Sequence, residues 1–286
     1  MKAIRRIVLL LCVAISAFML FGCKKSEEGL NFEKTPDGKG YIVAKYIGEE
    51  KEVIVPAKHE GLPVVAIGAS AFNGCTKMES IVLPESIQLI EEYAFYRCTK
   101  LLDIHIPSGV KVIENNAFKN CEHLRYIYLP DTLESLGATA FAYCSRITDI
   151  YIDDANTVYH DENHCLIETD SKTLVLGCQY SVIPEDDSVT SIGASAFCGA
   201  KFLESIKIPS NITKIDAQAF QDCSGLKAVY LSKSITEIGE YAFFGCIGLD
   251  VVYYEGTRLQ WDAISVKDYN YHFSGASIYC EADISK

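Results

Sequence analysis

Hydrophobic residues recur along this chain with a period of 23 residues. The clearest marker is the pair Ala-Phe, which occurs seven times between residues 71 and 243, at Phe72, Phe95, Phe118, Phe141, Phe197, Phe220 and Phe243. Neighbouring copies are 23 residues apart, except for the fourth and fifth, which are 56 apart. A repeat of this length is typical of a solenoid, in which each unit is one coil that buries its apolar residues only against the next coil.

Other hydrophobic columns accompany each Phe. The position five residues before it is always aliphatic, as is the position eight before it, for example Ile67 and Val64. At six, nine and eleven residues after the Phe, the pattern is L-x-x-L-x-L, as in Leu101-x-x-Ile104-x-Ile106. The alternation at nine and eleven has the period of a β-strand. Seven such strands, about 4.8 Å apart, are expected to form one parallel sheet along the stack.

The repeat resembles a known family most clearly in its second and third copies. Residues 90–107 read IEEYAFYRCTKLLDIHIP, and residues 113–130 read IENNAFKNCEHLRYIYLP. These copies resemble the BspA-type leucine-rich repeats of bacterial surface proteins, and the resemblance covers Gly61 to about Glu255. It implies an α/β leucine-rich-repeat solenoid that is mostly β, with a parallel sheet on one face and short helical turns on the other. No asparagine ladder follows the strands, so we expect a flatter stack than a horseshoe.

The regions outside the repeat differ from it in composition. The domain organisation that we predict is a signal peptide at 1–22, a flexible tether at 23–34, an N-terminal cap at 35–66, the solenoid at 67–255 with an insertion at about 153–187, and a C-terminal cap at 256–286. The N-terminal cap contains two expected strands, Tyr41–Ile47 and Val53–Pro56. Caps are needed because the terminal coils would otherwise expose their apolar faces.

The first 22 residues have the pattern of an export signal. Three basic residues precede an apolar run, Ile7–Phe21, which is shorter than the roughly 20 residues of a membrane-spanning helix. Leu20-Phe21-Gly22-Cys23 resembles the bacterial lipoprotein box, which implies cleavage before Cys23, lipid on that cysteine and an exported, membrane-anchored protein. An ordinary signal or an uncleaved anchor is the alternative.

The charge of the chain bears on its partners. The formal net charge is −12, and removal of residues 1–22 would take away three basic residues and no acidic ones. Nucleic-acid binding needs a clustered basic surface, so we expect no nucleic-acid partner.

Six of the twelve cysteines occupy one repeat column, at Cys75, Cys98, Cys121, Cys144, Cys223 and Cys246. Equivalent positions in adjacent coils lie about 4.8 Å apart, whereas the Cβ atoms of a disulfide are closer, at about 3.8 Å. We therefore expect these thiols to be free and buried. Cys165 and Cys178 could face each other across the insertion, and their pairing is left open.

The insertion contains a predicted hairpin, in which Cys165–Glu168 and Thr173–Gly177 flank a turn. It also contains His160 and His164, four residues apart among carboxylates. A zinc-protease motif would have Glu where Asp161 stands, so the pattern favours a solvated loop over a metal site. No other catalytic motif is recognised, so we predict a protein that is not an enzyme and has no cofactor or metal. A hydrolase with its site in this insertion remains the less favoured alternative.

The strand position between the two core residues is expected to point outward, because neighbouring strand residues alternate. It carries Tyr in four of seven units, although the chain has only 17 Tyr in 286 residues. Cross-strand stacking for stability is one explanation, and a recognition surface is the other. The candidate binding face comprises His105, Tyr126, Tyr128, Tyr151, Lys207, Tyr230 and Tyr253. The favoured function is binding of an extracellular protein or glycan, and the alternative is an envelope spacer without a dedicated ligand.

Overall fold

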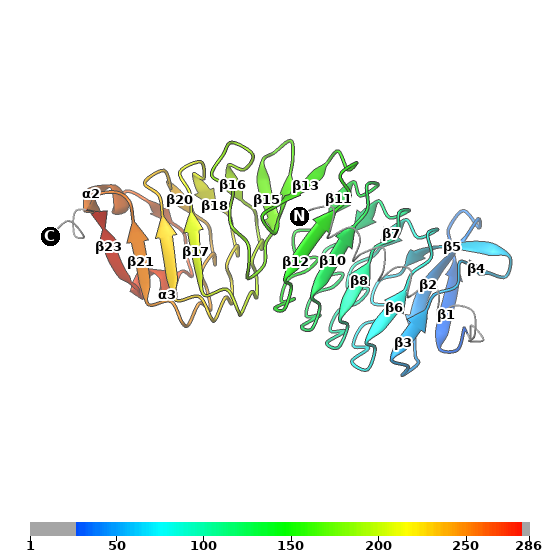
Figure 1. Ribbon diagram of the computed structural model, residues 1–286. Coiled ribbons are helices and arrows are strands. Elements are labelled where there is room, and N and C mark those ends of the chain that lie inside the picture. Colours follow the sequence, from blue (N-terminus) through cyan, green and yellow to red (C-terminus); the bar gives the residue numbers. More distant parts are fainter. Residues whose placement is uncertain (1–26, 282–286) are drawn as a thin grey trace.

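Each 23-residue unit forms one coil, and the coils stack into an elongated solenoid (Figure 1). The computed structural model describes residues 27–281. The predicted signal peptide and the predicted lipidation site Cys23 lie outside the described residues. The fold is mostly β, as expected, and its two described helices, α2 (Arg258–Trp261) and α3 (Tyr271–Gly275), are short and lie near the C-terminal end.

The seven strands predicted from the L-x-x-L-x-L pattern lie on one side of the solenoid, and one strand from each predicted cap, β3 (Glu52–Ile54) and β23 (Ser277–Cys280), extends them. We call these nine strands the front strands. They pair in parallel with their core residues aligned, as Ile104, Ile127 and Ile150 show. The front strands are β3, β6 (Ser80–Val82), β8 (Asp103–His105), β10 (Tyr126–Leu129), β12 (Asp149–Ile152), β17 (Ser205–Ile208), β19 (Ala228–Leu231), β21 (Val251–Tyr254) and β23.

The prediction that these strands form one sheet is wrong. They form three separate sheets, β3–β6, β8–β10–β12 and β17–β19–β21–β23. The largest break, between β12 and β17, falls where the insertion separates the fourth unit from the fifth. We call the coils that carry β3 to β12 the N-terminal block and the coils that carry β17 to β23 the C-terminal block.

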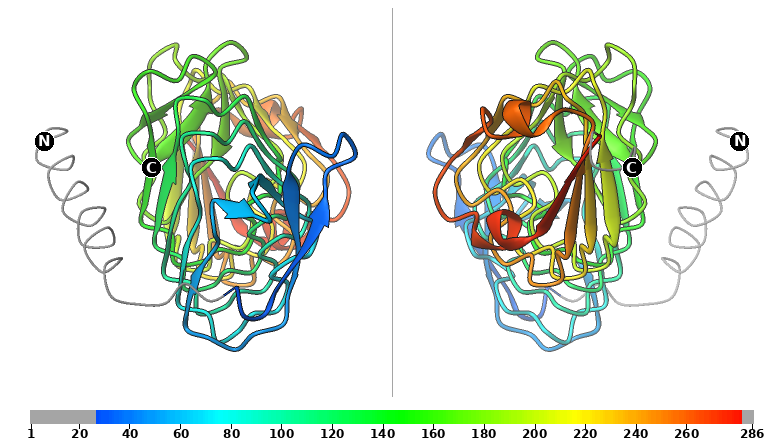
Figure 2. Two further views of the ribbon diagram at one scale, coloured as in Figure 1. Left: turned by 90° about the vertical axis from the view of Figure 1, so that its right-hand side faces the viewer. Right: turned by 90° about the vertical axis from the view of Figure 1, so that its left-hand side faces the viewer.

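A second set of short parallel strands comes from the aliphatic column five residues before each Phe. These strands are β5 (Leu62–Ile67), β7 (Leu89–Ile90), β9 (Val112–Ile113), β11 (Ser135–Leu136), β16 (Ser191–Ile192), β18 (Lys214–Ile215) and β20 (Glu237–Ile238), and β22 (Ser265–Val266) of the C-terminal cap extends the set. Viewed along the stack, the coils surround one interior (Figure 2).

The repeat Phe side chains fill that interior, as the sequence predicted. All seven are at most 3% exposed. Phe118 stacks between Phe95 and Phe141, with ring centroids 4.9 and 5.0 Å away and nearly parallel planes. A second stack runs through Phe197, Phe220 and Phe243. Each ring therefore buries its two faces against its neighbours along the stack.

The Ala-Phe-x-x-Cys segments form consecutive turns rather than helices. The residue two positions after each Phe has a left-handed backbone in all seven units, including the non-glycine residues Arg97, Asn120, Tyr143 and Asp222. A left-handed residue cannot continue a right-handed helix, because its carbonyl points away from the helical direction. The expected helical turns are thus limited to single turns, closed by bonds such as the one from the Cys98 N–H to the Phe95 carbonyl.

The column cysteines are buried or half-buried and free, as predicted. The thiol of Cys121 also donates a hydrogen bond of 3.2 Å to the carbonyl of Phe95 in the preceding coil, and Cys98, Cys144, Cys223 and Cys246 make the equivalent bond. The cysteine column therefore satisfies buried backbone carbonyls as well as filling space.

The N-terminal cap starts earlier than expected. β1 (Leu30–Lys34) pairs antiparallel with β2 (Tyr41–Tyr46), and β2 pairs in parallel with β5, whose first residues form a short hairpin with β4 (Lys58–His59). The predicted tether at 23–34 is therefore wrong from Leu30 onward. Its apolar residue Leu30 is buried under the first coil, so this segment is part of the cap.

The predicted C-terminal cap contains one further, irregular coil. Phe273 on α3 stacks on Phe243 at 4.7 Å and so extends the Phe column. β22 and β23 extend both sets of strands. Trp261 on α2 packs against Phe273 and Tyr254 and covers this end of the core.

The insertion forms an antiparallel sheet of β13 (Tyr159–Glu162), β14 (Cys165–Glu168) and β15 (Thr173–Leu176), which includes the predicted hairpin. β15 continues in parallel with β16. Both faces of β14 are buried, since Leu166 packs into the core of the N-terminal block while Cys165 and Ile167 pack into the core of the C-terminal block. The insertion is thus a wedge between two cores.

This arrangement bears on whether Cys165 and Cys178 form a disulfide, which the sequence left open. Cys165 faces the C-terminal core, whereas Cys178 packs with the N-terminal core. Both thiols are free. Burial raises the pKa of Cys165 to about 12, so this thiol is protonated at neutral pH.

Candidate binding face

The outward column of the front strands forms two separate surfaces rather than one. In the N-terminal block, Tyr128 and Tyr151 lie directly opposite each other, with rings 5.0 Å apart and nearly parallel. His105 lies next in line, 6.4 Å from Tyr128. Tyr126, two residues before Tyr128, is also on this face and is 42% exposed. We call these four residues the N-terminal tyrosine surface.

The second surface lies on the C-terminal block. The rings of Tyr230 and Tyr253 stack at 4.9 Å, and Lys207 precedes them in the register. Tyr279 extends the stack, 5.7 Å from Tyr253. We call these four residues the C-terminal tyrosine surface. Tyr279 was not predicted from the sequence, because its spacing from Tyr253 is 26 residues instead of 23.

The stacking shows how the tyrosine rings are used. Two rings that lie parallel and about 5 Å apart each cover one face of the other, so the stacked faces contribute to stability and are no longer open. The stability explanation therefore accounts for the ring faces. The stacking does not cover the hydroxyl-bearing edges, so the stability explanation and the recognition explanation are compatible.

The two surfaces differ in the row that lies two residues before the tyrosine column. In the N-terminal block this row contains Asp103, Tyr126 and Asp149, which align in register. In the C-terminal block it contains the small residues Ser205, Ala228, Val251 and Ser277. The row beside the first surface therefore contains two carboxylates, whereas the row beside the second surface contains no charged residue.

A groove adjoins the N-terminal tyrosine surface, where β8, β10 and β12 end. Its volume is about 340 Å³, and His105, Tyr128 and Tyr151 contribute to its lining. Five carboxylates also line it: Glu85, Asp131, Asp153, Asp154 and Asp161. We call it the tyrosine–aspartate groove. This groove was not predicted from the sequence, although Glu85, Asp131 and Asp154 share one repeat column, thirteen residues after the Phe.

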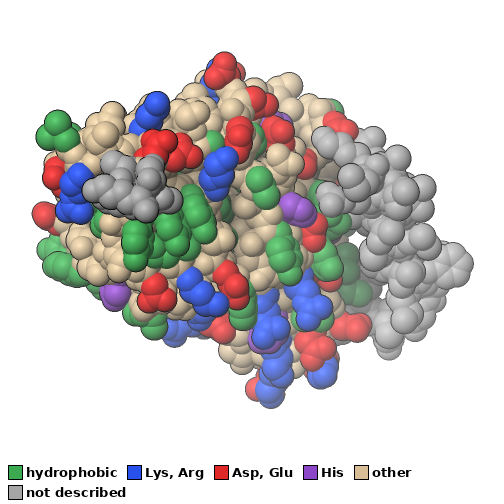
Figure 3. Space-filling model, turned by 60° about the vertical axis from the view of Figure 1, so that its left-hand side comes forward, with side chains coloured by type: hydrophobic (Ala, Val, Ile, Leu, Met, Phe, Trp, Pro, Cys, Tyr) green, Lys and Arg blue, Asp and Glu red, His purple; other side chains and the backbone are tan. Residues whose placement is uncertain are grey.

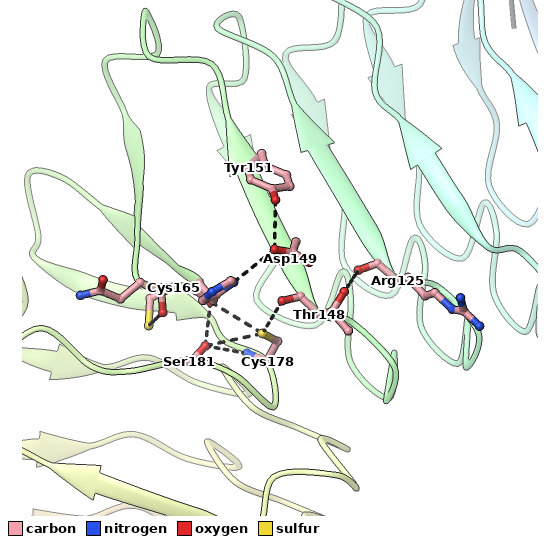
Figure 4. Close-up of polar contacts among 9 residues, drawn as sticks. Arg125, Thr148, Asp149, Tyr151, Cys165, Cys178 and Ser181 are labelled. Atoms are coloured by element: carbon pink, nitrogen blue, oxygen red, sulfur yellow. Dashed lines mark hydrogen bonds and ion pairs between the residues drawn. The ribbon is translucent and has the colours of Figure 1, made fainter. Parts of the chain in front are cut away.

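A histidine of the insertion contacts the carboxylate that is hydrogen-bonded to one tyrosine of this groove. The Tyr151 hydroxyl donates a 3.0 Å hydrogen bond to Asp149, and Nδ1 of His164 lies 3.4 Å from the same carboxylate oxygen (Figure 4). Below them, the thiol of Cys178 contacts the carbonyl of Thr148 at 3.5 Å. His164 has a left-handed backbone, with φ 63°, which turns the chain between β13 and β14.

The two insertion histidines do not converge on a common site. His160 Nδ1 contacts the hydroxyl of Thr169 at 3.0 Å, whereas His164 contacts Asp149. Within residues 27–281, no group of three or more His, Cys, Asp or Glu side chains is arranged to hold a metal ion. The alternative of a hydrolase site in the insertion therefore gains no support from the geometry.

Charges of both signs are distributed over the surface. Lys and Arg side chains are interspersed with Asp and Glu on the face shown in Figure 3. Several form exposed pairs between adjacent coils, such as Lys111 with Glu134 at 2.8 Å and Lys207 with Glu185 at 2.6 Å. In the described part of the chain, no helix has both the length and the apolar character needed to cross a membrane.

Comparison with known families identifies the repeat. Residues 65–186 and 176–259 match the family model described as the BspA type leucine rich repeat region, with six copies. The chain therefore belongs to the BspA-type leucine-rich-repeat family. No curated protein matches it at a significant level.

Solved structures share the fold. A T. pallidum leucine rich repeat protein, TpLRR, is 27% identical, with a TM-score of 0.52, covering 79% of this chain and 91% of its own. A leucine-rich repeat protein from Eubacterium ventriosum is 18% identical, with a TM-score of 0.56, covering 80% of this chain and 70% of its own. The pneumococcal vaccine antigen PcpA is 14% identical, with a TM-score of 0.50 and 80% of both chains covered. The last two comparisons establish similarity of fold alone.

Proposed function

We propose that this protein is an exported bacterial lipoprotein, anchored through Cys23, whose solenoid binds an extracellular protein or glycan. The observation that carries the proposal is the N-terminal tyrosine surface beside the tyrosine–aspartate groove. Tyr residues offer a large contact area with a polar tip, and they are enriched at interfaces. A concave site with a few convergent polar groups is the usual form of a binding site.

The binding test uses the soluble chain from residue 24 onward. Immobilised protein is exposed to extracellular proteins and to a glycan array, and bound ligands are identified. Tyr128→Ala combined with Tyr151→Ala is expected to lower the affinity for the captured ligand by about tenfold or more, because both side chains line the groove.

The matched control is Tyr230→Ala combined with Tyr253→Ala. This variant removes the same kind of stacked pair from the C-terminal block. It is expected to keep binding. If the Tyr128→Ala, Tyr151→Ala variant folds like the native chain and binds the ligand equally well, the N-terminal tyrosine surface is not the binding site. If the native chain captures no ligand at all, an envelope spacer is the better explanation.

The anchoring test concerns Cys23. Two or more acyl chains give stable membrane attachment, which one chain does not. We expect mass spectrometry of the membrane fraction to find Cys23 as the lipid-modified N-terminal residue. The Cys23→Ser variant should carry no lipid, so it should no longer be recovered with the lipoproteins that detergent extracts from the membrane. An unmodified Cys23 in the native protein would contradict the anchor but not the binding proposal.

A further inference from the structure

We propose that an aromatic cluster of the C-terminal block binds a proline-rich peptide segment of a partner protein. The cluster consists of Tyr241, Phe244, Tyr269 and Tyr271, and we call it the aromatic turn cluster. It is carried by the Ala-Phe-x-x-Cys turn around Phe243 and by the start of α3. None of its residues belongs to either tyrosine surface, so the inference goes beyond the proposed function.

The four rings of the cluster contact one another in a continuous chain. Tyr241 and Tyr269 stack with centroids 4.2 Å apart and planes within 3° of parallel. Phe244 lies edge-on to Tyr241 at 5.6 Å, and Tyr271 lies edge-on to Tyr269 at 6.1 Å. Tyr269 is 40% exposed and Tyr271 is 65% exposed. The cluster therefore presents aromatic surface to solvent, and aromatic residues are enriched where proteins bind partners.

The tyrosine hydroxyl groups of the cluster lie close together. Burial raises the pKa of Tyr241, and the neighbouring Tyr269 side chain adds to this shift electrostatically and through a hydrogen bond. Glu240 and Tyr271 lie near enough to raise the same pKa further. The hydroxyl of Tyr241 is thus protonated at neutral pH, and a protonated phenol can donate a hydrogen bond. The cluster combines apolar ring area with hydroxyl donors in one place.

The fold does not require tyrosine at two of these positions. Tyr241 and Tyr269 have left-handed backbones, with φ 58° and 63°. Tyr241 lies two residues before its repeat Phe, and the same left-handed position holds Ser70, Asn116 and Gln218 in other units. Asn tolerates this conformation better than Tyr does, so backbone preference does not explain the tyrosines. A shared role in binding explains them.

The chemistry of the cluster fits a proline-rich segment. Such a segment forms an extended helix without internal hydrogen bonds, so its backbone carbonyls can accept hydrogen bonds from tyrosine hydroxyls. Its pyrrolidine rings pack on aromatic side chains, which is how proline-rich segments bind aromatic-lined sites in other proteins. The segment is also largely ordered before it binds, so little conformational entropy is lost.

The partner is a different protein rather than a second copy of this chain. The sequence contains eight Pro residues, and the two that are nearest to each other, Pro56 and Pro63, are seven positions apart. Another copy of residues 1–286 therefore offers no proline-rich segment.

The test measures binding of a fluorescent polyproline peptide by anisotropy, using the soluble chain from residue 24 onward. A Gly-Ser peptide of the same length is the negative probe. We expect Tyr269→Asn combined with Tyr271→Ala to weaken binding of the polyproline peptide by about tenfold or more, because both rings and both hydroxyls are lost. Asn suits the left-handed backbone at residue 269, so this variant should keep the urea midpoint of the native chain.

The matched control is Tyr93→Asn combined with Tyr96→Ala. Tyr93 also has a left-handed backbone, and its ring lies edge-on to that of Tyr96 at 5.4 Å. The control removes two tyrosines from an equivalent turn of the N-terminal block and should change the affinity by less than about twofold, because distant sites act independently. Equal losses in the two variants would mean that any exposed tyrosine pair attracts the peptide, and would overturn the inference.

Two further outcomes would also overturn it. One is that the native chain does not bind the polyproline peptide. The other is that a neutral oligosaccharide such as chitohexaose binds instead and is lost in the Tyr269→Asn, Tyr271→Ala variant, which would make the cluster a glycan site. Neither outcome bears on the proposed function, because its test depends on Tyr128 and Tyr151.

Discussion

Phe118 illustrates how much stability one repeated residue contributes. Its side chain is fully buried, and both ring faces stack on neighbouring Phe rings. Phe118→Ala is expected to lower the free energy of unfolding by about 3–5 kcal/mol, through lost burial and the cavity that remains. The change in the urea midpoint, with the slope unchanged, measures this cost.

An exposed residue of the same fold provides the control. Lys233 lies on the surface, and Lys233→Ala should change the free energy of unfolding by less than about 0.5 kcal/mol. Similar urea midpoints for the Phe118→Ala and Lys233→Ala variants would contradict the stacked core.

At the residue scale the sequence was informative where the period holds. The buried Phe column, the free cysteine column and the outward tyrosines follow from a fixed spacing and from strand alternation. The thiol hydrogen bonds to Phe carbonyls were not predictable, because they depend on how each cysteine side chain is oriented toward the preceding coil. Tyr279 was not predicted because it aligns with Tyr253 in the sheet although the two residues are not one repeat length apart in the sequence.

At the scale of the elements, the insertion decides how the two blocks meet. Gly177 follows β15, and a Cβ atom built on it would clash with the ring of Phe197. Phe197 is the first ring of the second stack and is 1% exposed, so it has no free space into which to move. Gly177→Ala is expected to lower the free energy of unfolding by about 1–3 kcal/mol.

Gly275 is the matched control for this substitution. Apart from its chain neighbours and the backbone of its own helix, no described atom lies within 4 Å of a Cβ built there, and its backbone is not left-handed. Gly275→Ala should therefore leave the thermal unfolding midpoint nearly unchanged or raise it slightly. A Gly177→Ala variant as stable as Gly275→Ala would show that the junction can repack around the added methyl group.

The insertion also explains which elements could not be predicted. The hairpin was predicted from two apolar runs on either side of a turn, but the insertion as a whole was expected to be a solvated loop on the surface of the solenoid. The run Cys165-Leu166-Ile167 is apolar on both faces, which is typical of a strand buried on both sides. The partner of each face is set by distant units, so the break in the front sheet emerged only in three dimensions. The groove depends on the same placement, because Asp161 comes from the insertion and Asp131 from the third unit.

At the scale of the whole molecule, the wedge joins two cores that each have their own Phe stack. Their links include the Leu166 side chain and a 2.6 Å hydrogen bond from the Tyr143 hydroxyl to Asp222, 79 residues away in sequence. In a repeat protein, stability is close to the sum of unit stabilities and interfaces between neighbours. The cooperativity of this chain therefore depends on the junction between the two cores, which the repeat does not specify.

Leu166→Ala tests this dependence. Leu166 is fully buried, extends from β14 into the N-terminal core and connects it to the sheet of the C-terminal block. Its removal should cost about 2–5 kcal/mol at the interface between the blocks. In the native protein we expect one transition in urea. In Leu166→Ala, the N-terminal and C-terminal blocks should unfold at different urea concentrations, because the coupling between them is weaker than the stability of either core.

Trp261 makes the measurement possible, because it is the single Trp of the chain and packs on the C-terminal core. Its fluorescence reports the C-terminal block, whereas far-ultraviolet circular dichroism reports both. Coincident curves are the test for a two-state transition. Leu174→Ala is the matched control, since Leu174 is equally buried but packs within the C-terminal core. Its two curves should shift to lower urea together, whereas those of Leu166→Ala should separate. If both variants keep coincident curves, the blocks fold as one unit and the wedge is not the weak interface of the solenoid.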